Sequence, residues 1–180
     1  MIFGKRIRLR SAEREDIPRF VAWLNDPEVY VHLSPRETLS GAEEEQWFEK
    51  MLALPAEEHI LVIEIAIAED WQPIGNMSLL RIDWRERSAE IGIFIGEKRF
   101  WNRGYGREAI QLMVRHAFCD LNLNRIFLRV DENNPRAIRA YEHAGFIHEG
   151  KMRQARFQDN GYIDVLLMSI LHSEWQENVD

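Results

Sequence analysis

The chain divides into segments in which apolar residues recur at every second position and segments in which they recur with a helical period. Alternating apolar and charged residues predict an edge strand at residues 7–10. Apolar segments bounded by turn-forming residues predict further strands at 59–68, 73–82, 88–95 and 125–130. Residues 146–156 and 162–171 are predicted to pair as a hairpin around the Asp159-Asn160-Gly161 turn.

The helical spacing of apolar residues predicts about four helices. The first follows Ser11 and ends at residues 25–27. The second covers residues 42–54, and its opening glutamates suit the positive end of the helix dipole. The third begins at Arg107 after a glycine-containing loop, and the fourth covers 136–143 before a Gly145 cap. Strands with interspersed helices predict an α/β fold on a mixed sheet.

Length and composition favour one compact domain. The 180 residues, 46% of them hydrophobic, suffice for a single core, which we place at residues 1–175 with a frayed tail at 176–180. No basic and apolar leader precedes the first strand, and no apolar run reaches membrane-spanning length. We therefore expect a cytoplasmic protein with no membrane partner.

The composition also narrows the chemistry. The single cysteine, Cys119, excludes an internal disulfide, and its place on the apolar side of a helix predicts a buried thiol. The six histidines show no close pair at metal-ligand spacing, so we expect no metal. The net charge of -7 argues against a nucleic-acid partner held on a basic face. It is compatible with attracting a cationic substrate, although solubility alone is the favoured explanation.

The segment Arg99-Phe100-Trp101-Asn102-Arg103-Gly104-Tyr105-Gly106 lies between an apolar strand and a helix. Such a loop suits an anion, because free backbone N–H groups and the positive end of the helix dipole converge there. Gly104 and Gly106 allow close backbone approach, and Arg103 and Arg107 add positive charge. The loop lacks the lysine of nucleotide triphosphatases and the third glycine of dinucleotide folds. Taken alone, it could also be an ordinary strand-to-helix connection.

Two motifs carry a family resemblance. Residues 101–106 resemble the pyrophosphate-binding loop of the GNAT superfamily of acetyl-CoA-dependent N-acetyltransferases, whose pattern is Gln/Arg-x-x-Gly-x-Gly/Ala, with Trp101 standing at its first position. Residues 133–146 resemble the Asn-x-x-Ala-x-x-x-Tyr-x-x-x-Gly-Phe signature of the same superfamily. The resemblance covers nearly the whole chain. It implies a mostly antiparallel sheet of about seven strands flanked by about four helices.

The resemblance also implies how acetyl-CoA is bound. Backbone amides of Arg99 to Gly106, among them those of Trp101, Asn102, Arg103 and Tyr105, would hold the pyrophosphate. Ile93, Phe94 and Ile95 would offer backbone groups to the pantetheine arm, on a strand that separates from its parallel neighbour. These three could also be ordinary core residues. Asn133 would contact the pantetheine, and Arg136 or Arg139 would reach the phosphates unless they are solvated surface charges.

The catalytic candidates are Tyr141 and Glu90. By resemblance, the Tyr141 phenol would protonate the departing thiolate of coenzyme A, whereas a helical tyrosine outside this context would more often be a packing residue. The superfamily has no universal motif for the base that removes the amine proton. Glu90, at the start of the strand beside the cofactor, is our candidate, with an edge or salt-bridged glutamate as the equal alternative.

The acceptor is less defined. The chain looks most like the branch of ribosomal-protein N-terminal and spermidine acetyltransferases, and the acidic and aromatic residues that could bind such an amine are Glu28, Tyr30, Glu43, Glu44, Trp47, Asp83 and Trp84. These could equally be surface and core residues. As acceptor, a protein N-terminus or a polyamine is favoured, while an aminoglycoside or a small amino acid derivative remains open. Whether an acyl group other than acetyl is preferred is also open.

Two further readings stay open. A non-catalytic acyl-CoA sensor would keep the fold without turnover, although the intact loop and tyrosine motif disfavour it. Apolar residues such as Trp84 and Trp101 could form a homodimer patch or line the active-site cleft.

Overall fold

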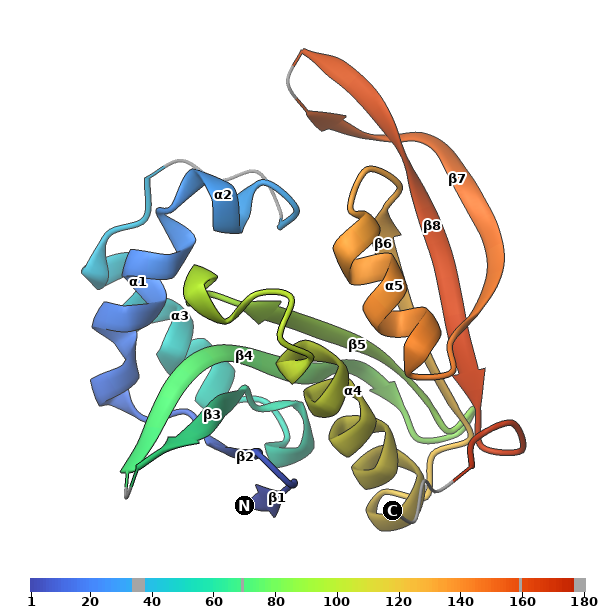
Figure 1. The fold of residues 1–180 in the computed structure, drawn as a ribbon, viewed down its shortest axis with the longest axis horizontal. Helices are drawn as coiled ribbons and strands as arrows, with labels where there is room; N and C mark the ends of the chain where they lie inside the picture. Colours follow the sequence, from blue (N-terminus) through green and yellow to red (C-terminus); the bar gives the residue numbers. More distant parts are fainter. Residues whose placement is uncertain (34–37, 69, 159, 177–180) are drawn as a thin grey trace. The chain divides into compact units, whose positions relative to one another are not determined.

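The computed structural model describes residues 1–33, 38–68, 70–158 and 160–176 (Figure 1). It comprises two compact units, the first formed by Met1–Leu79 with Gly92–Gly106 and the second by Leu80–Ile91 with Arg107–Asp180. The single domain predicted over residues 1–175 stays a prediction. Of the predicted tail at 176–180, residues 177–180 lie outside the described part of the chain.

The strands form an eight-stranded sheet in the order β1-β2-β3-β4-β5-β6-β8-β7, which confirms the mixed, mostly antiparallel α/β fold with one strand more than predicted. The strands are β1 (Ile2–Phe3), β2 (Ile7–Ser11), β3 (Leu61–Ile67), β4 (Asp70–Asp83), β5 (Ser88–Ile95), β6 (Arg125–Asp131), β7 (Ile147–Gln158) and β8 (Gly161–Leu171). The pair β5–β6 is parallel, and the pairs β1–β2, β2–β3, β3–β4, β6–β8 and β7–β8 are antiparallel.

The five α-helices among the described residues are α1 (Ile17–Leu24), α2 (Pro27–Tyr30), α3 (Gly41–Leu52), α4 (Tyr105–Arg115) and α5 (Pro135–His143). The one-turn helix α2 was not predicted; its N-cap is Asp26, whose side chain accepts from the Glu28 N–H. The strand predicted at residues 7–10 is not an edge, because the short strand β1 pairs with its outer side. None of the described helices is long and apolar enough to cross a membrane.

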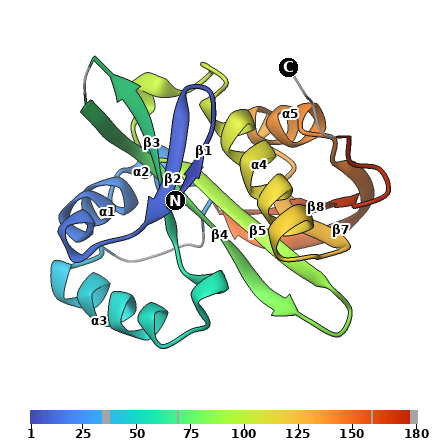
Figure 2. The same ribbon diagram turned by 90° about the horizontal axis from the view of Figure 1, so that it is seen from below.

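In the first unit, α1 and α3 lie side by side (Figure 2). Their apolar faces meet in one core that contains Phe20, Trp23, Phe48 and Met51. The helix α3 starts at a capping box, in which Ser40 accepts from the Glu43 N–H and Glu43 accepts from the Ser40 N–H. Capping satisfies N–H groups that have no partner within the helix. Glu43, which the sequence also offered as a residue that could bind the amine, thus serves in the cap of α3.

In the second unit, β8 pairs with β6 on one side and with β7 on the other, and β7 and β8 form a long hairpin (Figure 1). The segment His116–Asp120, which follows α4, is π-helical and buries Ala117 and Phe118. Cys119 is exposed, so the prediction of a buried thiol was wrong. A π turn changes the angular position of the residues that follow, and helical spacing alone does not anticipate that shift.

Candidate functional site

The glycine-containing loop belongs to the first unit and has the backbone of an anion-binding turn. After the short helix at Lys98–Phe100, Asn102 and Gly104 adopt left-handed φ values of +59° and +83°. The helix α4 then begins at Tyr105, two residues earlier than predicted. A left-handed turn that opens directly into a helix leaves backbone N–H groups outside regular pairing, where they can bind an anion.

Trp101 anchors this loop to the end of β5. Its indole Nε1–H donates to the carbonyl oxygen of Ile95 at 2.7 Å, and its half-buried side chain packs against the core cluster of the unit. The indole thus takes up one of the two acceptor positions of the Ile95 carbonyl. The side chains of Ile93 and Phe94 are also half-buried, and Phe94 lies edge-on to Trp23.

Glycines allow the backbones of β4 and β5 to approach closely just before the loop. A Cβ at Gly75 would lie 2.2 Å from the carbonyl oxygen of Phe94, and one at Gly96 would lie 2.1 Å from the Trp23 ring. The carbonyl oxygen of Ile74 accepts from the N–H groups of both Gly96 and Glu97. The start of the loop is therefore fixed by backbone contacts as well as by Trp101.

Arg6 contacts the other end of the loop and was not singled out from the sequence. It donates to the carbonyl oxygen of Arg103 at 3.1 Å, and its guanidinium lies over the Tyr105 ring at 4.6 Å. Its hydrogen-bond partner is 97 residues away in the chain. Arg6 stands among other basic residues in the segment Lys5 to Arg10, so the sequence does not single it out for this contact.

Most of the acceptor candidates already have partners within their own unit. Glu28 and Asp26 both contact the Lys98 ammonium at 2.8 Å. Glu44 is buried, at 2% exposure, and Trp47 packs against the core cluster. In the second unit, Asp83 accepts from the N–H groups of two following turn residues. Trp84 is exposed, and its place in a dimer patch or in a cleft stays a prediction.

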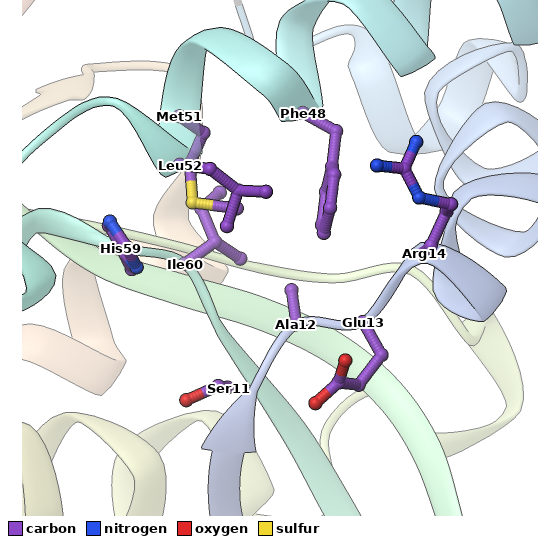
Figure 3. Close-up of a pocket in the computed structure, with 9 residues that line it drawn as sticks. All are labelled: Ser11, Ala12, Glu13, Arg14, Phe48, Met51, Leu52, His59 and Ile60. Atoms are coloured by element: carbon purple, nitrogen blue, oxygen red, sulfur yellow. The ribbon is translucent and has the colours of Figure 1, made fainter.

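The first unit also holds a pocket of about 340 Å³ beside α3 (Figure 3). Phe48, Met51 and Leu52 extend from α3 toward Ala12 and Ile60. The other residues that line the pocket are Ser11, Glu13, Arg14 and His59. None of the predicted cofactor residues lines this pocket.

Tyr141 lies in α5 of the second unit and is buried, at 6% exposure, with its ring edge-on to Phe146. Burial raises the pKa of the Tyr141 phenol well above its ordinary value, because ionisation would place a charge out of water. The phenol is protonated at neutral pH, as a proton donor must be, and its raised pKa makes it a weaker acid than an exposed tyrosine.

The two asparagines before α5 have different partners. Asn134 is the N-cap, and its side-chain oxygen accepts from the Ala137 N–H at 3.1 Å. Asn133 is exposed and donates to the Gln158 side chain at 3.0 Å. Arg136, in the first turn of α5, is half-buried, and burial lowers the pKa of its guanidinium. Asn133 thus has a side chain that can exchange one exposed partner for another.

Glu90 is buried in the second unit between two arginines. It accepts from Arg129 at 3.0 Å and forms an ion pair with Arg81. A carboxylate held by two guanidinium groups is a poor proton acceptor, since protonation would cost both ion pairs. The salt-bridged alternative therefore has a structural basis, and the role of a general base stays a prediction.

The parallel strands β5 and β6 pair only briefly. The pairing covers Ser88–Arg125, Ala89–Ile126 and Glu90–Phe127, while β6 goes on pairing with β8 as far as Asp131. Ile91 and Leu128, the next residue of each strand, do not continue the β5–β6 ladder. The expected separation of the two strands, which would leave N–H groups of β5 for other partners, stays a prediction.

The described residues fit the predicted acetyl-CoA. The left-handed turn at Asn102 and Gly104 and the start of α4 would hold the pyrophosphate, and backbone groups of Ile93 and Phe94 would hold the pantetheine. The bound thioester would supply an activated acetyl group. The role of Tyr141 toward this group stays a prediction. No group of three or more His, Cys, Asp or Glu side chains is placed to hold a metal ion in the part of the chain that the structure describes.

Comparison with known proteins agrees with this reading. Residues 6–147 match the model of the acetyltransferase (GNAT) domain. The chain is 32% identical over 175 residues to a spermidine N(1)-acetyltransferase of Vibrio cholerae, covering 96% of both chains. It is also 32% identical over 114 residues to a putative ribosomal N-acetyltransferase of Bacillus subtilis, covering 63% of this chain and 62% of that one.

A crystal structure of spermidine N-acetyltransferase from Vibrio cholerae in complex with CoA and spermine superposes with a TM-score of 0.86. It is 30% identical in sequence, and the match covers 95% of this chain and 98% of that one. The family model, the sequence relatives and the structural similarity all indicate the same family as the two sequence motifs. The chain belongs to the GNAT acetyltransferase family and is an acetyl-CoA-dependent N-acetyltransferase.

Proposed function

We propose that the protein transfers an acetyl group from acetyl-CoA to a primary amine of a polyamine, by direct attack of the amine while both substrates are bound. The observation that carries this proposal is the similarity, over nearly the full length of both chains, to the enzyme whose crystal structure holds CoA and spermine. The glycine loop and the buried Tyr141 support the proposal, because they match the parts that the family resemblance implies for turnover.

The first unit already contains an alkylammonium bound by carboxylates. Lys98 lies between Asp26 and Glu28, and hydrogen bonds to these two groups raise its pKa. The Glu28 side chain is 70% exposed, so a cationic substrate can approach it from solvent. A polyamine presents the same primary ammonium as lysine, and the net charge of -7 attracts it over longer distances.

Tyr141 is our candidate for the proton donor to the thiolate of coenzyme A. Its buried phenol is protonated at neutral pH and is geometrically fixed by packing on Phe146. Asn133 and Arg136 are proposed to contact the cofactor from the start of α5. A homodimer and a cytoplasmic location also stay predictions.

The test is coenzyme A release from acetyl-CoA with spermidine, spermine, aminoglycosides, amino acids and peptides with free N-termini. We expect turnover on the polyamines, with kcat/KM at least tenfold above that on any peptide. Turnover on peptides instead would assign a protein N-terminus as acceptor. Tight acetyl-CoA binding without release on any amine would overturn the proposal in favour of the acyl-CoA sensor.

A further inference from the structure

The carbonyl of Arg103 and the N–H of Gly104 belong to one peptide plane at the centre of the glycine loop. In a trans peptide these two groups point in opposite directions. Arg6 holds the carbonyl oxygen with a hydrogen bond of 3.1 Å, so the Gly104 N–H must point to the side of the loop opposite Arg6. Which groups the loop presents to an anion therefore depends on the orientation of this single plane.

Glycine leaves that plane free to turn over. A flip of the Arg103–Gly104 peptide would move φ of Gly104 from +83° to about -97°, and glycine populates both regions almost equally. After the flip, the carbonyl oxygen of Arg103 would take the place of the Gly104 N–H and repel an anion. The residue that lets the backbone approach a phosphate also allows the loop to adopt a non-binding state.

Arg6 is placed to prevent the flip. Its guanidinium donates to the Arg103 carbonyl, lies over the face of Tyr105 at 4.6 Å, and has Nη2 3.3 Å from where a Cβ at Gly104 would stand. Tyr105 is itself fixed by an edge contact with Phe100. A planar guanidinium can stack and donate in fixed directions at the same time, which an ammonium cannot. In Figure 2 the turn between β1 and β2 lies beside the loop that precedes α4.

We propose that Arg6 is a positioning residue that locks the Arg103–Gly104 peptide in the orientation that binds the pyrophosphate of acetyl-CoA. This inference rests on the cofactor-binding role of the loop. Arg6 acts on the loop from the side opposite the Gly104 N–H, and its effect on the cofactor passes through the backbone. Loss of Arg6 should therefore weaken the binding of ligands that carry the pyrophosphate.

The matched pair of variants is Arg6→Met and Lys5→Met. Lys5 is the neighbouring exposed cation, so both variants lose one positive charge in the same turn. We expect Arg6→Met to raise the Kd for CoA at least tenfold by calorimetry and the Kd for pantetheine, which lacks the pyrophosphate, less than twofold. Lys5→Met should change both constants less than twofold.

The decisive readout is the Gly104 amide in ¹⁵N NMR spectra of the free protein. We expect one sharp signal in the wild type and in Lys5→Met, and a shifted or exchange-broadened signal in Arg6→Met that CoA sharpens again. Arg6→Lys separates geometry from charge, because the lysine keeps the charge without the planar fork. It should restore at most part of the CoA affinity.

Three results would overturn the inference: equal CoA affinities for Arg6→Met and Lys5→Met, full restoration by Arg6→Lys, or an unchanged Gly104 signal in Arg6→Met. Failure of the wild type to bind CoA would be a different result. It would contradict the cofactor role of the loop, and the Gly104 signal of the free proteins would still decide whether Arg6 holds the peptide.

Discussion

The indole Nε1–H of Trp101 donates to the carbonyl oxygen of Ile95 at 2.7 Å, and this hydrogen bond links the glycine loop to the end of β5. The family pattern has Gln or Arg at the position of Trp101. Both of those side chains can also donate a hydrogen bond. The substitution therefore preserves a donor and adds an apolar surface that packs on the core of the first unit.

Trp101→Phe removes the donor and keeps most of the ring. We expect the free energy of unfolding to fall by about 1 kcal/mol, because the half-buried carbonyl loses a hydrogen bond. The Kd for CoA should rise several-fold, since the loop loses its anchor to β5. Thermal unfolding and calorimetry measure the two effects. Trp84→Phe, at an exposed turn position, is the control, and a change as large there would remove the role assigned to Trp101.

Tyr141→Phe tests the proton donor. We expect kcat to fall by about 100-fold or more, as for the loss of a general acid, while the Kd for acetyl-CoA changes less than twofold. Tyr162→Phe, at an exposed position of the second unit, should leave kcat unchanged. A Tyr141→Phe enzyme with wild-type kcat would show that the phenol only packs.

The buried phenol also makes stability depend on alkaline pH. The pKa of Tyr141 is raised in the folded state, so folding favours the protonated form, and this contribution is complete below the unfolded pKa of about 10. It is lost as the pH rises beyond that value. Urea unfolding from pH 9 to 11 should show a steeper loss of stability in the wild type than in Tyr141→Phe. Equal slopes would contradict the assigned burial effect.

Much of this site follows from local sequence, and the rest depends on distant partners. Strand β5 occupies the predicted residues, and the loop and α5 lie where the two motifs place them. Apolar period and glycine position determine such features within a few residues. The contact of Arg6 with Arg103 joins segments 97 residues apart, for which single-residue patterns carry no signal. The π-helical turn at Cys119 departs from the α-helical spacing on which the prediction of a buried thiol depended.

Glu90→Gln separates a general base from a structural ion pair. We expect the free energy of unfolding to fall by about 1–2 kcal/mol. This is less than for a fully buried ion pair, because Arg81 and Arg129 are partly exposed. The shape of the kcat/KM profile against pH should stay the same. If Glu90 is the base, kcat/KM will instead fall most at low pH while the affinity for acetyl-CoA is kept. Steady-state rates from pH 6 to 9 decide between the two roles.

Gly75→Ala tests the close approach of β4 to β5. Its Cβ would lie 2.2 Å from the carbonyl oxygen of Phe94, a backbone atom that cannot move aside independently. We expect a loss of about 2 kcal/mol or more in the free energy of unfolding. Gly150→Ala, on β7, is the control, because a Cβ there meets nothing within 4 Å. Similar unfolding energies for the two variants would contradict the role given to Gly75.

The acid limit of stability should depend on Glu149. Two hydrogen bonds from Arg125, at 2.6 and 2.5 Å, and one from Ser169 lower the pKa of Glu149 from 4.5 to about 2. Folding thus favours the ionised form, and this contribution is present above pH 4.5 and lost as the pH falls toward 2. The side chain is 39% exposed, so solvent screening reduces the effect to about 1 kcal/mol.

Urea unfolding from pH 5 to 2.5 should show a shallower decline in the free energy of unfolding for Glu149→Gln than for the wild type. Glu86→Gln should follow the wild type, because Glu86 is 70% exposed and its contact with Arg85 is 3.6 Å long. Parallel declines in all three proteins would mean that the Arg125–Glu149 pair contributes nothing to acid stability.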